Sequence, residues 1–183
     1  MLSGDRVILR HEAMDKGQAE RLLPLLEEVL AEGGLRWADL AALVVGTGPG
    51  NFTGVRIAVA AARGLALGLE IPAFGVTRLE ALAHGLPRPV TVIEDARRGE
   101  VYVQEFGIDG PGVARISPDA AGISGPVTGT GAPAGLPAAL PLVVAMGQIG
   151  RQRLGGTPQR PAPFYLRAAD AAPPTDPPPV ILP

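Results

Sequence analysis

The sequence contains no cysteine and only two histidines, and both shortages limit the kinds of site that it can build. A chain without cysteine has no disulfide, no thiol nucleophile and no thiolate ligand for a metal. The histidines, His11 and His84, are too few and too far apart in the sequence to suggest a metal cluster. We therefore expect no metal site, and no sequence pattern marks a catalytic residue or a resident cofactor.

Positive charge and long apolar runs are scarce as well. Lysine and arginine together number 16, against 18 aspartates and glutamates, and Lys16 is the only lysine. A protein whose main task is to hold a polyanion needs a clustered cationic surface, so the net charge of -2 disfavours that class. No apolar run approaches the roughly 18 residues of a membrane span, and the start lacks the apolar centre of a signal peptide. These features predict a soluble cytoplasmic protein.

The first part of the chain alternates strand and helix patterns. The stretch DRVILRHE, which carries Val7, Ile8 and Leu9, alternates weakly and predicts a strand that ends near His11. Residues 18–32 place leucines and valines in a wide arc and predict a helix, which Pro24 should kink and Gly33 and Gly34 should end. The width of this arc exceeds what a helix needs to cover a sheet.

A βαβ unit follows. Residues 42–45 and the stretch PAFGV predict buried strands on either side of a long helix, which implies a parallel sheet. After the second strand, TRLEALAHGL predicts a short helix with Thr77 as its N-cap and Glu80 three residues later.

The pattern changes after residues 85–90, where two prolines and a glycine interrupt all periodicity. VTVIEDARRGEVYVQEF predicts a β-hairpin with Gly99 in or near its turn. Residues 107–141 offer only one strand candidate, near Val127; then LVVAMGQIGRQRL predicts a helix and PAPFYLR an extended end. We expect an N-terminal α/β lobe at 1–86, a smaller α/β lobe at 87–170 and a proline-rich tail at 171–183.

The glycine-rich stretch VVGTGPGNFTGVRIAVAAARGLALGL allows two interpretations. A glycine-rich turn that opens a helix suits an anion, so Gly48, Gly50, Asn51 and Thr53 form a weak candidate for phosphate binding. However, no Walker lysine follows, and the spacing misses the dinucleotide pattern. The more frequent alternative is a tight turn, in which Gly50 and Gly54 are expected to adopt positive φ.

The helix of that stretch is apolar on nearly every side. In a short chain, little material remains to cover its second face, so a partner subunit is the economical explanation; burial within its own domain is the alternative. With the wide leucine arc of residues 18–32, it predicts a two-helix interface on each subunit. The expected interface residues are Leu22, Leu26, Val29, Arg56, Val59 and Arg63.

Four stretches resemble one family in the right order. GTGPGNFTGVRIAVAAARGLALGLEIPAFGVTRLEALA and EDARRGEVYVQEF are similar to its two signature stretches, while AERLLPLLEEVLAEGG and PAPFYLRAAD are similar to its first helix and C-terminal motif. On these residues the chain is identified as a member of the bacterial TsaB (YeaZ) family of tRNA threonylcarbamoyladenosine biosynthesis proteins, once grouped with glycoprotease-like proteins.

The resemblance implies a two-lobed, actin-like or Hsp70-like α/β fold related to ribonuclease H. It also implies a noncatalytic subunit, homodimeric when alone, that pairs with a catalytic homologue, TsaD. Together with the ATPase TsaE, TsaD transfers a threonylcarbamoyl group onto the adenosine beside the anticodon of tRNA. The H-x-x-x-H spacing that holds the metal of the catalytic relative does not occur in this sequence.

The sequence departs from the family in three places. The family opens with a β-hairpin whose first strand carries an Asp-Thr or Asp-Ser pair, whereas this chain begins where the second strand should be ending. Asn51 stands where serine is usual, and the second lobe looks abbreviated. We expect the chain to be shorter at its N-terminus than the functional gene product, or a strand from a second copy to fill the gap.

Two rival functions remain open. A sugar-kinase-like phosphotransferase would keep acidic metal-binding residues on a first strand, and a peptidase would need a nucleophile motif that Ser3, Ser117 and Ser124 do not show. Glu94 and Asp95 could act as paired carboxylates, but adjacent strand residues point to opposite faces. Direct tRNA binding is weakened by the net charge; its candidates are Arg97, Arg98, Arg151, Arg153 and Arg160.

Overall fold

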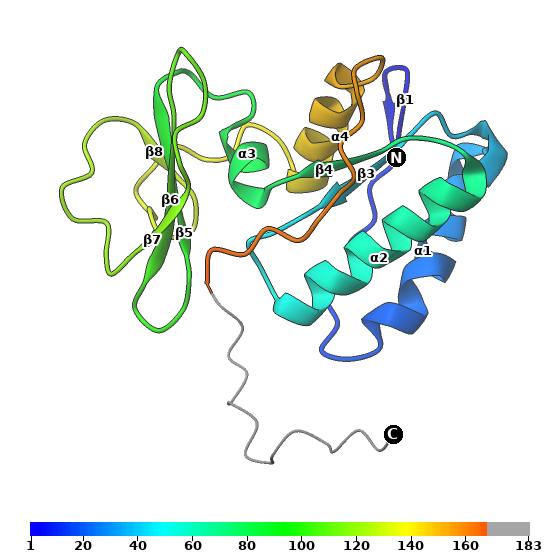
Figure 1. Cartoon of the computed structure of the whole chain (residues 1–183), viewed down its shortest axis with the longest axis horizontal. Helices are drawn as coiled ribbons and strands as arrows, with labels where there is room; N and C mark the ends of the chain where they lie inside the picture. The colour runs from blue at the N-terminus through cyan, green and yellow to red at the C-terminus, as the bar shows by residue number, and fades with distance from the viewer. Residues whose placement is uncertain (168–183) are drawn as a thin grey trace, which may run out of the picture.

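The computed structural model describes residues 1–167, so the proline-rich tail predicted at 171–183 lies outside the described residues. The described chain forms two groups of elements that meet at a short helix (Figure 1). One group is built on a parallel strand pair flanked by helices, and the other on a four-stranded sheet. This is a mixed α/β arrangement, as the sequence predicts.

The first lobe is centred on the parallel strands β3 (Leu43–Gly46) and β4 (Ala73–Val76). The long helix α2 (Phe52–Leu69) connects them, which confirms the predicted βαβ unit. Successive side chains of β3 face opposite layers: Val45 packs in a cluster with Val59 of α2.

The opposite layer is formed by α4 (Leu142–Gln152), which follows the second lobe in sequence and returns to the first. A Cβ atom built on Gly150 would come within 2.1 Å of a Val44 methyl, so helix and strand approach too closely for any side chain at 150. Figure 1 shows α4 on one side of the strand pair and both α1 (Gln18–Gly33) and α2 on the other. The lobe boundaries at 86 and 170 stay predictions.

The N-terminus differs from the predicted strand at residues 7–9. The structure has a short antiparallel hairpin, with β1 (Leu2–Ser3) pairing β2 (Arg6–Val7). The prediction that the strand continues to near His11 was wrong, because the backbone pairing ends at Ile8, whose N–H and C=O bond Met1. Within residues 1–167, β3 pairs with β4 alone, so this hairpin does not extend the parallel pair.

Helix α1 ends where the glycines predict. Gly34 adopts a left-handed conformation, φ 67°, and its N–H bonds the carbonyls of the last turn. The helix continues through Pro24, which is exposed. A 3-10 turn, η1 (Trp37–Asp39), then leads into β3, close to the predicted helical turn.

The second lobe is a four-stranded sheet in the order β7-β6-β5-β8. Strands β5 (Val90–Asp95) and β6 (Val101–Phe106) form the predicted antiparallel hairpin. Strand β8 (Val127–Thr128) lies at the predicted position and pairs parallel to β5. The sequence gives no warning of β7 (Arg115–Ser117), which pairs with β6.

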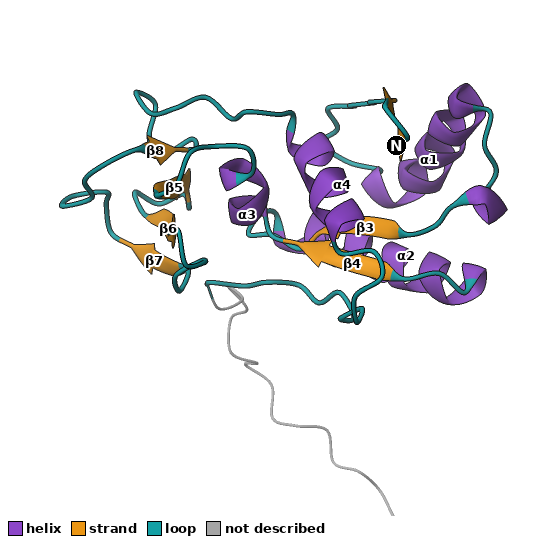
Figure 2. Ribbon diagram, turned by 90° about the horizontal axis from the view of Figure 1, so that it is seen from above, coloured by secondary structure: helices purple, strands orange, loops and turns teal. Residues whose placement is uncertain are grey.

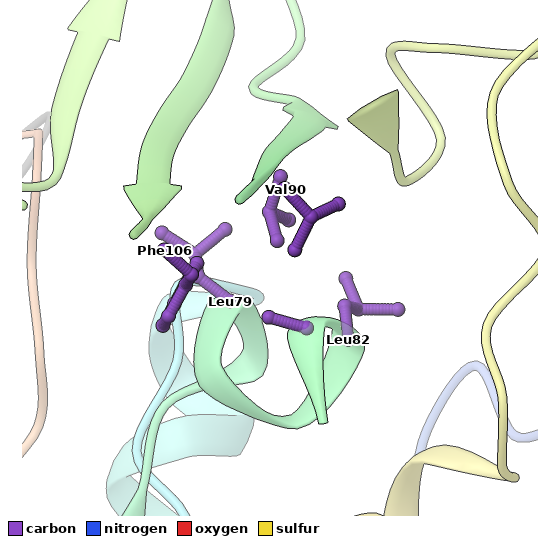
Figure 3. Close-up of a cluster of buried hydrophobic side chains, with 6 residues drawn as sticks. Leu79, Leu82, Val90 and Phe106 are labelled. Atoms are coloured by element: carbon purple, nitrogen blue, oxygen red, sulfur yellow. The ribbon is translucent and has the colours of Figure 1, made fainter. Parts of the chain in front are cut away.

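The two lobes meet at α3 (Arg78–Ala83). Thr77 is its N-cap, because the Thr77 hydroxyl accepts a bond from the Glu80 N–H at 3.0 Å, as predicted. Figure 2 shows α3 between the four-stranded sheet and α4. Its buried side chains enter the main core cluster, in which Leu79, Leu82, Val90 and Phe106 meet (Figure 3).

Candidate functional site

The loop between β3 and α2 has a different strained glycine from those predicted. Gly48 adopts φ +100°, and a Cβ there would lie 3.1 Å from the Phe164 carbonyl oxygen. Gly50 and Gly54 do not have positive φ, so that expectation was wrong. Gly54 already lies in the first turn of α2, where helical geometry fixes its conformation.

Of the four phosphate candidates, two reach a common cavity. Gly50 and Asn51 line it, whereas Gly48 is buried against the chain and Thr53 is exposed on α2. The Asn51 carboxamide oxygen accepts a bond from the Gly54 N–H at 2.8 Å, so Asn51 is an N-cap. The Gly48 carbonyl accepts from the Arg78 N–H at 2.7 Å. These bonds give the loop a structural role, and its use as a phosphate site remains a proposal.

A cleft of about 900 Å³ lies between the lobes. The start of α2 forms one wall and the β5–β6 hairpin the other, and the extended segment 164–167 closes one side. Its lining includes the side chains of Phe52, Arg78, Glu94, Arg97, Tyr102 and Tyr165.

The charged groups of this cleft are largely engaged with one another. Glu94, only 4% exposed, forms an ion pair with Arg78 across the lobes, and its second oxygen accepts from the Thr130 N–H at 2.8 Å. Arg167 pairs with Glu100 at the start of β6. Glu94 and Asp95 do not form a carboxylate pair: Glu94 is buried facing α3, while Asp95 is exposed and accepts from the Arg97 N–H at 2.7 Å.

The tip of the β5–β6 hairpin is a left-handed turn. Arg97, Arg98 and Gly99 have φ of 62°, 57° and 78°. Left-handed backbone favours glycine, and two consecutive arginines in it are uncommon. The turn is closed by the Glu100 N–H, which bonds the Arg97 carbonyl at 3.1 Å. The predicted position of Gly99 in the turn is therefore confirmed.

An aromatic cluster fixes the start of α2 to the C-terminal segment. The Phe52 and Tyr165 rings are 4.8 Å apart, and the Arg56 guanidinium lies 3.8 Å over the Phe52 ring. The Arg56 Nε donates to the Tyr165 hydroxyl at 3.0 Å. Residue Phe164 continues this attachment, because its N–H bonds the Thr47 carbonyl at 2.8 Å. The predicted end strand is thus an extended segment that does not join a sheet and is attached by individual hydrogen bonds and ring contacts.

The outer face of α2 forms a second candidate surface. A groove of about 390 Å³ runs along it, lined by Arg56, Val59, Ala60, Arg63, Gly64, Leu67, Arg160 and Pro163. No carboxylate lines this groove, and among the described residues Arg63 and Arg160 form no ion pair. Leu67 is 82% exposed. The groove is therefore both cationic and apolar.

The length and apolar composition of α2 would allow it to cross a membrane, contrary to the expectation that no run approaches such a length. The same helix, however, buries Val59 and Ala62 against β3. A helix that packs on a sheet can have the same length and apolar composition, and the buried inner face of α2 shows that it packs on β3.

The six predicted interface residues separate into two groups. Val59 is 2% exposed and Val29 is 9% exposed within the single chain, so both belong to the subunit's own interior. Assigning them to an intersubunit surface was wrong, because a helix that is apolar all round does not show which side faces the sheet. Leu22, Leu26 and Arg63 are half-buried, and Arg56 is exposed.

The most exposed apolar side chains of α1 and α2, Leu23 and Leu67, were not among the predicted interface residues. Leu23 is 45% exposed. The position of each leucine around its helix, relative to the buried residues, would have identified it as exposed. The sequence alone does not show which side of an apolar helix is buried. The contribution of Arg160 to the α2 groove was not predicted either, because residues 153 to 160 have no hydrophobic periodicity.

Among the arginines considered for tRNA binding, Arg151 and Arg153 are bound within the chain. Arg151 donates to the Gly4 carbonyl, and Arg153 binds the Gly75 carbonyl and pairs with Glu80. Within residues 1–167 no three His, Asp or Glu side chains gather in a group that could hold a metal ion.

The comparisons with known proteins agree with this architecture. The family model described as "TsaD: tRNA N6-adenosine threonylcarbamoyltransferase" matches residues 12–139. The solved structure "YeaZ from Pseudomonas aeruginosa" superposes with a TM-score of 0.72 at 28% identity, covering 90% of this chain and 92% of that one. The chain belongs to the TsaB (YeaZ) family. The resemblance read from the sequence is confirmed, and the two lobes are those of its actin-like, ribonuclease H-like α/β fold.

Two relatives show the extent of the TsaB similarity. The Escherichia coli (strain K12) tRNA threonylcarbamoyladenosine biosynthesis protein TsaB is 41% identical over 107 residues, and the match spans 56% of this chain but only 46% of that protein. An uncharacterized protein of Mycobacterium tuberculosis is 35% identical across 91% of this chain and 87% of its own length. The match to the named E. coli TsaB thus covers less than half of that relative.

Proposed function

We propose that this chain is a noncatalytic assembly subunit of the bacterial machinery that makes threonylcarbamoyladenosine in tRNA, and that it binds a TsaD-type catalytic homologue through the outer face of α1 and α2. The observation that carries the proposal is this uncovered face. It presents Leu23 and Leu67, 45% and 82% exposed, on adjacent helices of one layer of a TsaB-family fold. Exposed apolar side chains on a shared helical face are typical of association surfaces.

The state of the cleft supports a subunit without chemistry of its own. A general acid, base or metal ligand needs a carboxylate that is free to meet the substrate. Of the two carboxylates that line the cleft, Glu94 is held by Arg78 and Thr130, and one oxygen of Asp95 accepts a bond from the Arg97 N–H. Glu100, outside the cleft lining, pairs with Arg167 and ties the C-terminal segment to the second lobe.

The partners follow from this assignment. Alone, the chain forms a homodimer through the same helices; with TsaD it forms the complex that TsaE joins. It meets tRNA only through that complex, because the chain carries a net charge of -2 and its cationic groove measures only about 390 Å³. The site of action is the cytoplasm, with no membrane contact and no resident cofactor.

Reconstitution tests the proposal. The chain, a TsaD-type homologue, a TsaE-type ATPase, an activated threonylcarbamoyl donor, ATP and tRNA are combined, and threonylcarbamoyladenosine is measured by mass spectrometry of digested tRNA. We expect product formation that depends on the chain, with none from the chain alone. Product formed equally well without the chain would contradict the proposal.

The rival activities have their own measurement. Magnesium-dependent ATP turnover by the isolated chain would support the sugar-kinase-type phosphotransferase, and cleavage of a casein or peptide substrate would support a peptidase. Either activity, at a rate that scales with the amount of chain, would replace the noncatalytic assignment.

A further inference from the structure

The sequence that follows the described part of the chain is acidic and apolar. Residues 168–183 contain two aspartates, Asp170 and Asp176, and no lysine or arginine. Asp176 is followed by six apolar residues in a row, 177–182. Such a run gains free energy when an uncovered apolar surface of the protein removes it from water.

The groove along α2 offers both apolar surface and positive charge. Leu67 in its lining is 82% exposed, and a Cβ built on Gly64 would meet no atom within 4 Å. Arg63 and Arg160 also line the groove, and within residues 1–167 neither forms an ion pair. The segment 168–183 therefore complements this groove in both charge and polarity.

The segment also begins close to the groove. The Arg56 guanidinium lines the groove, and its Nε donates to the Tyr165 hydroxyl at 3.0 Å. Arg167, two residues after Tyr165, is the last described residue. Residues 168–175, extended at about 3.1 Å each, reach about 25 Å, which is enough for the chain to turn back to α2.

The apolar run has the length that the groove requires. Arg56 and Leu67 are eleven positions apart on α2, which makes about 16 Å along the helix axis. Asp176 and Ile181 are five positions apart, which makes about 16 Å in an extended proline-rich chain. Because proline fixes φ, a proline-rich segment loses little backbone entropy when it binds in extended form.

We propose that the α2 groove holds the segment 168–183 of its own chain, with Asp176 facing the arginines and residues 180–182 covering Leu67. This contact lies within one subunit and needs no second copy, so it goes beyond the proposed function. One consequence does rest on the proposed function: a catalytic homologue that docks on Leu67 displaces the segment.

A pair of thiols introduced into the full chain tests this contact. The chain has no cysteine, so an introduced pair forms the only disulfide that one molecule can make. Leu67→Cys with Ile181→Cys is compared with Val113→Cys with Ile181→Cys, because Val113 is 87% exposed in the second lobe. The effective concentration of the two thiols is measured in a glutathione redox buffer. We expect it to be about tenfold or more higher for the pair at 67 and 181, at the mass of a monomer.

Further substitutions in the pair at 67 and 181 separate docking from proximity. Val180→Ser with Leu182→Ser keeps the length of the segment, and we expect an effective concentration about fivefold or more lower, because apolar burial is lost. Asp176→Arg and Arg63→Glu should each lower it about two- to fivefold, and the two together should restore part of the loss. Thermal melts check folding; if Arg63→Glu unfolds the chain, Arg160→Glu at an exposed position replaces it.

Equal effective concentrations for the pairs at 67 and at 113, or no loss in the double serine variant, would overturn the docking. A disulfide found only between two molecules would assign the groove to the segment of a second copy and overturn the contact within one chain.

The consequence has its own outcome. An added TsaD-type homologue should lower the effective concentration of the pair at 67 and 181. If the homologue binds and the value stays the same, the displacement is wrong. If the homologue does not bind, the proposed function fails while the measured groove contact stands.

Discussion

At the scale of single residues, Gly48 is a position where both the backbone conformation and a close neighbour disfavour a side chain. Its φ of +100° is one that other residues adopt at a cost of about 1–3 kcal/mol, and a Cβ would press on the Phe164 carbonyl at 3.1 Å. We expect Gly48→Ala to lower the free energy of unfolding by about 1–3 kcal/mol.

The matched control for this change is Gly68→Ala. Gly68 lies in α2 with nothing within 4 Å of a built Cβ, so alanine should raise helix stability by about 0.5–1 kcal/mol. Both values come from denaturant unfolding followed by circular dichroism. Equal effects of the two alanines would show that the positive φ at residue 48 is not required.

A second residue-scale prediction concerns pH. Hydrogen bonds from Arg21 lower the pKa of Glu12 and of Glu28 and so tie the segment before α1 to the helix. A carboxylate with a lowered pKa stabilises the fold above its unfolded pKa, and this contribution is lost as pH falls through the folded pKa. Replacing Arg21 by methionine should raise the NMR titration midpoint of both carboxyl groups. Unchanged midpoints would show that the guanidinium is not bound to them in solution.

At the scale of elements, α3 determines how the lobes join. Leu79 is completely buried in the cluster that unites α3 with β5 and β6. We expect Leu79→Ala to cost about 2–5 kcal/mol, because a cavity is added to the lost apolar burial. The surface control Leu67→Ala, from a leucine 82% exposed, should change stability by less than about 0.5 kcal/mol. A small effect at residue 79 would mean that the lobes do not depend on α3.

Elements that depend on residues close together in the sequence were predicted correctly. The Thr77 cap, the Gly34 stop, the βαβ unit and the β5–β6 hairpin each depend on residues a few positions apart. The missed features depend on distant contacts. Strand β7 is three residues long and exists only through its pairing with β6.

The candidate surface shows the same limit. The sequence predicts an association surface on α1 and α2, but it places Val29 and Val59 there, although both are buried in the subunit. Only the packing of α2 on β3 reveals which side of an apolar helix remains outside. Likewise, the glycine-rich loop is recognisable as a turn, yet only the approach of Phe164 identifies Gly48 as the strained position.

At the scale of the whole molecule, the account makes this chain one part of a larger assembly. Two lobes enclose a cleft in which Glu94 is already ion-paired, while α1 and α2 each carry one exposed leucine, Leu23 and Leu67, and Leu67 lies in an arginine-lined groove. The surface most ready for a new contact is therefore the helical face and not the cleft.

The most direct test of this claim is the mass, by light scattering after size exclusion, of an equimolar mixture of the chain with a TsaD-type homologue. We expect a stoichiometric complex, and we expect the double variant Leu23→Glu, Leu67→Glu to abolish it. The double variant should keep the parent's thermal midpoint, because these side chains are 45% and 82% exposed. Two separate peaks at the masses of the isolated proteins, from folded parent samples, would contradict the account.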